Sequence, residues 1–312
     1  MEEILFKEVV EEWLNDKEKY VKASTYAFYL FELDTYILPY FGNIPMRLVS
    51  EETIQNAVVY WQETGGKKEH PLKKSTVQNL IMLTKQCLKY AGKQGYVVDS
   101  KIQVRFVSTE TIERKQKVFT KKEQSALIQA VLEEPSYKSL GVLLCLCCGL
   151  RIGEVCALRW ADIDLHNNTL HITKTLQRVY RADIEPHTRI MISSPKSFTS
   201  VRDIPLSEKV SSVMKSLEKR RKDGYILTNT ERYMEPRTFR KFYMNFLKIH
   251  GITQLNFHCL RHTFATRCIE GGGDYKSVSV ILGHATINTT LNMYVHPQEE
   301  EKRKCVEMIR WE

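Results

Sequence analysis

Residues 258–266 read His258-Cys-Leu-Arg-His-Thr-Phe-Ala-Thr266. On a helix, residues three and four positions apart lie on the same face, so His258, Arg261 and His262 crowd together. Three groups that can each carry positive charge repel one another unless an anion lies among them. The residues alone leave two interpretations, a solvated basic stripe or an anion-binding site. A zinc site lacks a proper set of ligands here.

A glycine and a histidine further along the chain indicate a junction between two helices. Gly283 is expected to end a short helix and to leave His284 at the junction. Thr286 or Ile287 begins the next helix, which carries Tyr294 about two turns later. Taken by itself, Tyr294 is either a packed aromatic side chain or a nucleophile.

An arginine follows the most apolar run of the chain, residues 141–150. We expect this run to form a buried helix that ends near Gly149, which places Arg151 at a buried junction. A buried guanidinium is costly unless an anion or a carboxylate pairs with it. Glu154, three residues later, can be that partner, so a structural ion pair and an anion site both remain open.

Length and composition exclude several classes of protein. The chain has 312 residues, 43% of them hydrophobic and 27% charged, which is ordinary for a globular protein. At ~100–200 residues per domain, this length predicts about two domains. The apolar run is about half of the ~20 residues that a membrane span needs. The acidic start lacks the pattern of a signal peptide. Membrane, secreted, fibrous and disordered classes are therefore not expected.

Positive charge is concentrated in two parts of the chain. Residues 1–63 hold 5 basic and 12 acidic residues, whereas residues 64–105 hold 9 basic and 2 acidic. The overall net charge of +9 therefore lies in residues 106–312. Clustered lysine and arginine displace counterions from phosphate backbones, so a polyanion such as nucleic acid is an expected partner.

Eight cysteines are present, and without an export signal we expect reduced thiols in the cytosol. Cys145 and Cys148 have the C-x-x-C spacing, but they lie within the apolar run and no second pair accompanies them. We therefore interpret them as small apolar side chains of a buried helix rather than as a metal site.

Apolar residues at helical spacing predict a compact bundle of helices in residues 1–105. Ser50 and Ser75 are expected to cap two of these helices, and residues 38–43 to form a turn. Residues 106–118 are polar and without periodicity, which indicates a linker.

After the linker, a capping-box pattern at Thr120 opens a helix. Short β-branched runs at residues 169–173, 189–192 and 201–205 predict a small antiparallel sheet, after which helices return. The expected fold is mainly α with this one small sheet.

The separate signals occur in a fixed order along the chain. They are Arg151-x-x-Glu154, Pro195-Lys196 before Arg202-Asp-Ile-Pro-Leu206, His258-x-x-Arg261, Leu282-Gly-His284 and Tyr294. This set resembles the tyrosine recombinase (phage integrase) family, in the form found in integrases of bacterial prophages and conjugative transposons. The resemblance covers nearly the whole chain. It implies a helical, SAM-like core-binding domain over residues 1–105 and a mixed α+β catalytic domain over residues 119–312.

The resemblance also implies a set of site residues for cutting and rejoining DNA without a metal, ATP or another cofactor. In this family two arginines and two histidines bind the scissile phosphate, a tyrosine attacks it to give a 3′-phosphotyrosyl link, a lysine is the general acid and a glutamate supports them. These roles fall on Arg151, Arg261, His258, His284, Tyr294, Lys196 and Glu154. Lys174 fits the lysine role less well, because the family places that residue in the turn before the Arg202 strand.

The implied partners are double-stranded recombination sites and further copies of the chain in a tetramer, in a bacterial cytoplasm at the nucleoid. An excisionase or a host bending protein is an additional expected partner, and a membrane is not. Residues 297–312 form a short amphipathic segment that packs either on its own domain or on a neighbouring protomer. The lysines expected to bind DNA are Lys67, Lys68, Lys73, Lys74, Lys85 and Lys89.

Two features depart from the commonest family pattern. Only about five residues precede the first expected helix, so we expect no separate arm-binding domain before it. His284 and Tyr294 are ten positions apart, one more than in many members, and one residue turns a helix by ~100°. Rival interpretations are a Xer-like resolvase, a topoisomerase-like phosphotyrosine enzyme, and a catalytically idle DNA-binding protein of the same fold.

Overall fold

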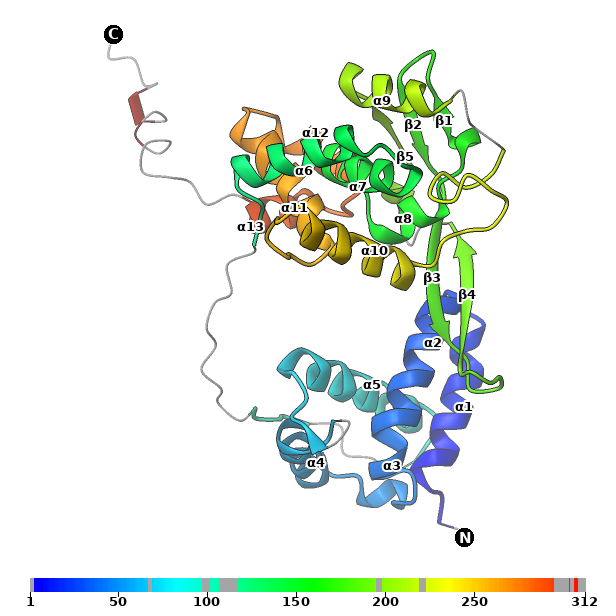
Figure 1. The fold of residues 1–312 in the computed structure, drawn as a ribbon. Coiled ribbons are helices and arrows are strands. Elements are labelled where there is room, and N and C mark those ends of the chain that lie inside the picture. Colours follow the sequence, from blue (N-terminus) through cyan, green and yellow to red (C-terminus); the bar gives the residue numbers. More distant parts are fainter. Residues whose placement is uncertain are drawn as a thin grey trace. The chain divides into compact units, whose positions relative to one another are not determined.

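A computed structural model describes residues 3–66, 69–96, 102–106, 117–194, 198–218 and 223–294, together with residues 303, 306 and 307. The chain forms two compact units (Figure 1). The first contains Met1–Glu113 and Arg178–Ile190, and the second contains Arg114–Gln177 and Met191–Glu312. The mainly helical fold with small antiparallel sheets is confirmed.

The first unit is a bundle of helices around an aromatic core. Its elements are α1 (Phe6–Glu18), α2 (Ala23–Glu32), a π-helical turn (Leu33–Ile37), α3 (Leu38–Phe41), α4 (Glu51–Glu63) and α5 (Lys74–Lys93). Phe6, Trp13 and Trp61 are almost fully buried among them. Ser50 caps α4 as predicted, because its hydroxyl accepts a hydrogen bond from the Thr53 N–H at 3.3 Å.

Two local predictions in this unit are wrong. Residues 38–41 are helical rather than a turn, because the π-helical turn Leu33–Ile37 precedes Pro39. This wider turn accommodates a proline whose ring would crowd the preceding carbonyls of an α-helix. The cap of α5 is Lys73 rather than Ser75, so α5 begins one residue before the serine.

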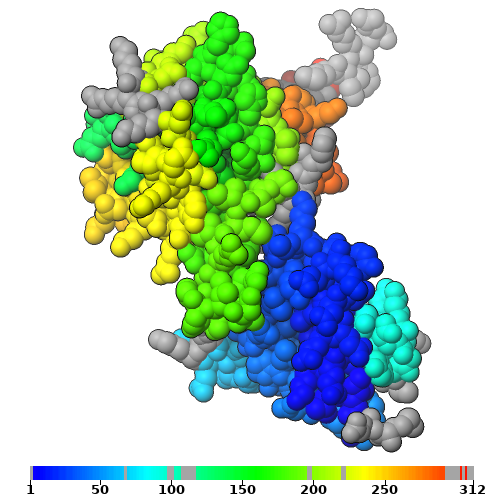
Figure 2. Space-filling model, turned by 90° about the vertical axis from the view of Figure 1, so that its right-hand side faces the viewer, coloured from blue at the N-terminus to red at the C-terminus, as the bar shows by residue number. Residues whose placement is uncertain are grey.

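The first unit also includes the tip of a two-stranded hairpin formed by β3 (Thr175–Tyr180) and β4 (Thr188–Ser193). The Tyr180 ring meets Phe31 edge-on at 5.5 Å, and its hydroxyl donates to Asp34 Oδ2 at 3.2 Å. Figure 2 shows this tip, in yellow-green, against the blue N-terminal helices. β3 was not predicted from the sequence, so the strands form two small sheets rather than one.

The second unit surrounds one helix that is buried along most of its length. That helix is α7 (Tyr137–Cys148), which packs mainly on α11 (His258–Glu270). Cys145 and Cys148 are buried in α7, as predicted, and burial raises the pKa of the Cys145 thiol. Thr120 opens α6 (Lys121–Glu133) with the predicted capping box.

The remaining elements of the second unit flank this pair. A three-stranded antiparallel sheet runs in the order β1-β2-β5, with Leu170 opposite Ile204. The bounds are α8 (Ile152–Ala157), β1 (Ile163–Asp164), β2 (Thr169–Ile172), β5 (Arg202–Pro205), α9 (Glu208–Glu218), α10 (Pro236–Ile249), α12 (Tyr275–Leu282) and α13 (Ile287–Tyr294).

Candidate active site

Two helix ends in the second unit supply carbonyl oxygens to the site. Gly149 (φ 66°) directly follows α7 and Gly283 (φ 63°) directly follows α12, both in the left-handed conformation that glycine tolerates. A Cβ atom on Gly149 would also lie 2.6 Å from the Phe264 ring. The last carbonyls of a helix have no partner within it. Here they accept hydrogen bonds from arginines.

Arg261 is the most buried arginine of the site, with only 2% of its surface exposed. Its Nη1 donates to the Gly149 carbonyl at 2.8 Å, and its Nη2 donates to the Leu282 carbonyl at 2.6 Å. One guanidinium therefore holds the ends of α7 and α12 together from its position on α11. These two hydrogen bonds fix the position and orientation of the guanidinium.

Arg151 lies directly before α8, and its side chain is 36% exposed. Its Nη1 donates to Glu154 Oε1 at 2.8 Å, and its Nη2 donates to the Gly283 carbonyl at 3.0 Å. The Arg151 backbone N–H donates to Glu154 Oε2 at 2.9 Å. The predicted pairing with Glu154 is therefore present, and it leaves the guanidinium partly open to solvent.

Arg202, at the start of β5, is a third arginine whose role the sequence did not reveal. It is buried, and its Nη1 and Nη2 donate to the two oxygens of Glu154 at 3.1 and 3.0 Å. Its Nε donates to the Ile281 carbonyl at the end of α12. In the sequence, Arg202 stands out only as part of the strand motif Arg202-Asp-Ile-Pro-Leu206, without a role of its own. We refer to Arg151, Arg202 and Arg261 as the arginine cluster.

The Glu154 carboxylate joins Arg151 and Arg202, and only 2% of its surface is exposed. Burial alone would raise the pKa of this carboxyl. The hydrogen bonds and charge of Arg202, together with the charge of Arg151, outweigh burial and lower the pKa below its ordinary value. Glu154 therefore stays ionised and bonded to both arginines.

Two histidine rings are in contact in the first turns of α11. The His258 and His262 rings meet edge-on, with their centroids 4.5 Å apart. Loss of surrounding water lowers the pKa of both, with further lowering from Arg261 and, for His258, from Arg151. For His262 the pKa falls to about 4, also because His258 is adjacent. Both rings are therefore mostly neutral at pH 7, so the basic stripe is less cationic than the sequence suggested.

His284 lies at the junction between α12 and α13, as predicted. Its Nδ1 is 2.8 Å from the hydroxyl of Thr290, a fully buried residue of α13. Desolvation, followed by the charges of Arg261, Arg151 and Arg202, lowers the His284 pKa to about 4. With Nδ1 engaged by Thr290, Nε2 is the ring atom that can address a bound anion.

Of the remaining predicted site residues, only some lie within the described part of the chain. Tyr294 is the last residue of α13, which begins at Ile287 as predicted, and its side chain lies outside the described part of the chain. Lys196 lies outside the described residues altogether. Lys174 is exposed between β2 and β3.

The arrangement suits a bound phosphodiester. Arginine donates pairs of parallel hydrogen bonds that match phosphate oxygens, and fixed donors stabilise charge that develops on such oxygens. Contacts with Arg151 and Glu154 link the end of α12 to α8, and contacts with Arg261 link it to α7. The cluster is thus built from segments that are far apart in the sequence.

Comparisons with known proteins identify this architecture. Residues 117–301, well over half of the chain, match the phage integrase family. Residues 5–62 match the N-terminal SAM-like domain of phage integrases. The chain belongs to the phage integrase family. The resemblance to the tyrosine recombinase (phage integrase) family is therefore confirmed.

Related proteins carry recombinase and transposase names. A tyrosine recombinase XerC-like protein of Caldanaerobacter subterraneus subsp. tengcongensis is 28% identical over 260 residues, covering 75% of this chain and 65% of that protein. The transposase from transposon Tn916 of Enterococcus faecalis is 27% identical over 198 residues, covering 57% of this chain and 47% of that protein. The chain thus covers less than two thirds of the length of these relatives.

Solved integrase structures share the fold. The Tn1549 transposon integrase in complex with transposon right end DNA has a TM-score of 0.78 at 21% identity, over 97% of this chain and 99% of that one. A lambda integrase tetramer bound to a Holliday junction has a TM-score of 0.66 at 15% identity, over 100% of this chain and 80% of that one. The fold of this family member is therefore that of known integrases.

In the first unit, this family member carries four of its six predicted DNA-binding lysines on or beside α5. Lys73 is the cap residue, and Lys74, Lys85 and Lys89 are exposed helix residues. Lys67 and Lys68 lie outside the described residues. Within the described ranges, no helix is both long and apolar enough to cross a bilayer, and no three His, Cys, Asp or Glu side chains gather as a metal site.

Proposed function

We propose that this chain is a site-specific DNA recombinase that integrates or excises a mobile element. It would cut and rejoin duplex DNA through a 3′-phosphotyrosyl link, without a metal or ATP. The observation that carries this proposal is the arginine cluster. Its guanidiniums are fixed by Glu154 and by four helix-end carbonyls before any DNA is bound. Such fixed donors stabilise phosphoryl transfer, because no reorganisation is needed in the transition state.

In the proposed first step, the Tyr294 oxygen attacks the scissile phosphorus, and its phenolic proton passes to solvent water. The bond between phosphorus and the 5′-oxygen breaks, and that oxygen takes a proton from Lys196. The products are a 3′-phosphotyrosyl bond and a free 5′-hydroxyl. A 5′-hydroxyl that attacks the phosphotyrosyl bond reverses the step. The phosphodiester is thus conserved in the covalent intermediate, and rejoining needs no ATP.

Arg151 and Arg261 would bind the non-bridging oxygens, and His258 and His284 would add neutral donors. If the Thr290 hydroxyl donates to His284 Nδ1, the ring proton lies on Nε2, which would then donate to the phosphate. Glu154 and Arg202 would hold Arg151 in place without touching the DNA. These assignments need no charge beyond that of the arginines to balance the phosphate.

We propose residues 1–105 as a core-binding domain, residues 106–118 as a linker and residues 119–312 as the catalytic domain. Lys67, Lys68, Lys73, Lys74, Lys85 and Lys89 would contact DNA phosphates. The chain would act in a bacterial cytoplasm as a tetramer on two DNA sites, with an excisionase or bending protein as a further partner. The tail at residues 297–312, which is almost wholly outside the described residues, would dock on a neighbouring protomer.

A nicked suicide duplex tests the proposal. Cleavage beside the nick releases a short strand, so a covalent adduct accumulates instead of being rejoined. We expect the adduct with the wild-type chain in EDTA, and none with Tyr294→Phe, which still binds the DNA. If the wild type binds a selected site yet gives no adduct, the chain is an idle DNA-binding protein. Recombination between two sites separates a recombinase from a topoisomerase-like enzyme, which would only relax supercoils.

A further inference from the structure

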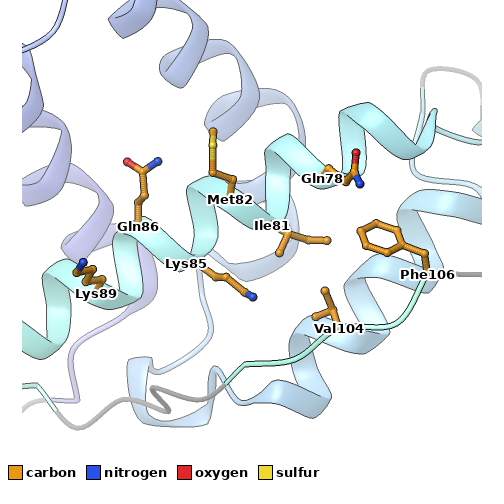
Figure 3. A pocket seen from close by; sticks show the side chains of 8 residues that line it. All are labelled: Gln78, Ile81, Met82, Lys85, Gln86, Lys89, Val104 and Phe106. Carbon is orange, nitrogen blue, oxygen red and sulfur yellow. The ribbon is translucent and has the colours of Figure 1, made fainter. Parts of the chain in front are cut away.

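Helix α5 of the first unit presents a polar face beside a groove. The groove is open and is lined by Gln78, Ile81, Met82, Lys85, Gln86, Lys89, Val104 and Phe106. Figure 3 shows Met82 and Gln86 on one edge of α5, whereas Ile81 and Lys85 extend from the other edge toward Val104 and Phe106. The lining residues of α5 that are exposed or half-buried are Gln78, Met82, Lys85, Gln86 and Lys89, and we call them the α5 face.

The net charge of α5 indicates which class of molecule can bind to the α5 face. Over its 20 residues the helix carries four lysines and no acidic residue. Helix α1 of the same unit has five acidic residues and two lysines in 13 positions. The two helices thus present opposite charges, and only α5 suits a polyanion.

The segment after α5 is fixed against one side of the helix. Lys85 Nζ donates to the Ile102 carbonyl at 2.8 Å, and Lys74 Nζ lies 5.2 Å from the centre of the Phe106 ring. These contacts order residues 102–106 beside the helix. The opposite edge, with Met82 and Gln86, remains at the surface.

Three uncharged side chains of the α5 face recur every four positions. Gln78, Met82 and Gln86 therefore follow one stripe along the helix, with Lys85 and Lys89 beside it. A glutamine donates to and accepts from adenine N6 and N7 together, and an apolar side chain contacts the thymine methyl group. Lysines bind phosphates at any sequence. The stripe therefore holds the residue types that read A·T pairs, flanked by those that bind the backbone.

We propose that the α5 face lies in the major groove and reads A·T pairs of the recombination site through Gln78, Met82 and Gln86. This inference rests on the proposed recombinase function and names the residues that select its DNA. At ~1.5 Å of rise per residue, Gln78 and Gln86 lie about 12 Å apart along the helix. That distance matches about three to four base pairs, and the major groove, ~12 Å wide, admits a helix.

Selection of binding sites from a random duplex library tests the proposal with the full chain. We expect the wild type to enrich a motif with preferred adenines at two positions about three to four base pairs apart. Gln78→Ala and Gln86→Ala should each reduce the preference at one of these positions by about 5-fold or more. Gln129→Ala, an exposed glutamine on α6, is the matched control and should leave the motif unchanged.

A change of specificity separates reading from a structural effect. Gln86→Arg should replace the preferred adenine by guanine at one position, because arginine pairs with guanine O6 and N7. A misfolded variant would lose all binding instead, and thermal melting identifies it. An unchanged motif in both Gln86→Ala and Gln86→Arg overturns the proposal. Failure of the wild type to form the Tyr294 adduct on its own enriched site would instead overturn the proposed function.

Discussion

The arginine cluster of the second unit and the α5 face of the first unit both contain positively charged side chains, but these side chains are held in different ways. Arg202 and Arg261 are buried and bond to groups 48 and 112 residues away in the sequence. The α5 face extends from a single helix, and Lys85 on it donates a hydrogen bond to a carbonyl only 17 residues away. Phosphoryl transfer needs donors that are fixed before the reaction, whereas recognition needs donors that reach a varied surface.

The largest expected effect is that of Arg261→Lys, which removes the hydrogen bonds that fix a guanidinium of the arginine cluster. Lysine keeps the charge but cannot bond to the Gly149 and Leu282 carbonyls with two separate nitrogens. Single-turnover adduct formation should fall by about 100-fold or more. The DNA sequence preference should stay the same. A rate within a few-fold of wild type would mean that charge alone suffices at this position.

Glu154→Gln removes the carboxylate shared by Arg151 and Arg202. Losing one partner of a buried ion pair should lower the free energy of unfolding by about 3 kcal/mol, as measured by urea denaturation. Glu270→Gln is the matched control, because Glu270 also pairs with an arginine three residues away, but at the surface. Its loss should cost less than about 1 kcal/mol. Equal losses would show that Glu154 is no special anchor.

Much of the fold and several residues of the candidate site could be predicted from the sequence. Motif order placed Arg151, Arg261 and His284, and apolar spacing placed α1 and α7. The role of Arg202 could not be predicted, because its partners Glu154 and Ile281 come from two distant segments. The cap at Lys73 and the helix at residues 38–41 also depend on tertiary context rather than on local preference. The residues that we propose to read bases on α5 were not predicted, because glutamine and methionine on an exposed helix do not by themselves indicate a ligand.

The pH dependence of the free energy of unfolding tests whether His284 is held close to the three arginines. Desolvation and then Arg261, Arg151 and Arg202 lower its pKa to about 4, so the unfolded chain binds its proton first. This histidine therefore costs stability as pH falls from ~6.5 to about 4. Glu32 acts oppositely, since burial raises its pKa to about 7. Glu32 is present in both the wild type and His284→Gln, so the difference between their stabilities reports the titration of His284.

Relative to wild type, His284→Gln should gain about 1–3 kcal/mol of stability as pH falls through that window. Denaturation by urea at pH 7, 6, 5 and 4.5 measures this difference. A difference that is constant with pH would show that His284 titrates normally and is not held among the arginines.

Thr290→Val should have a smaller effect, through the orientation of His284. The substitution keeps the shape but removes the hydroxyl that contacts Nδ1, which should slow adduct formation about 10-fold with unchanged DNA affinity. Thr290→Ser should restore most of the rate. Equal rates for the valine and serine variants would show that the hydroxyl does not position the ring.

The smallest expected effect is that of Lys89→Ala on the α5 face. Loss of one phosphate contact should weaken binding a few-fold at all sequences and reduce the salt slope of log affinity by about 0.9. Lys17→Ala on the acidic helix α1 should change neither quantity. The measurement is DNA affinity over a range of salt concentrations, and an altered motif in Lys89→Ala would contradict a role limited to the backbone.

Sequencing of covalently trapped DNA ends from a random library tests the division between the two regions most directly. It reports the yield of cuts and their sequence preference in one measurement. We predict that Arg202→Lys lowers the yield and keeps the preference, and that Gln86→Arg keeps the yield at its new preferred sites and changes the preference. A changed preference in Arg202→Lys together with an unchanged one in Gln86→Arg would contradict the account.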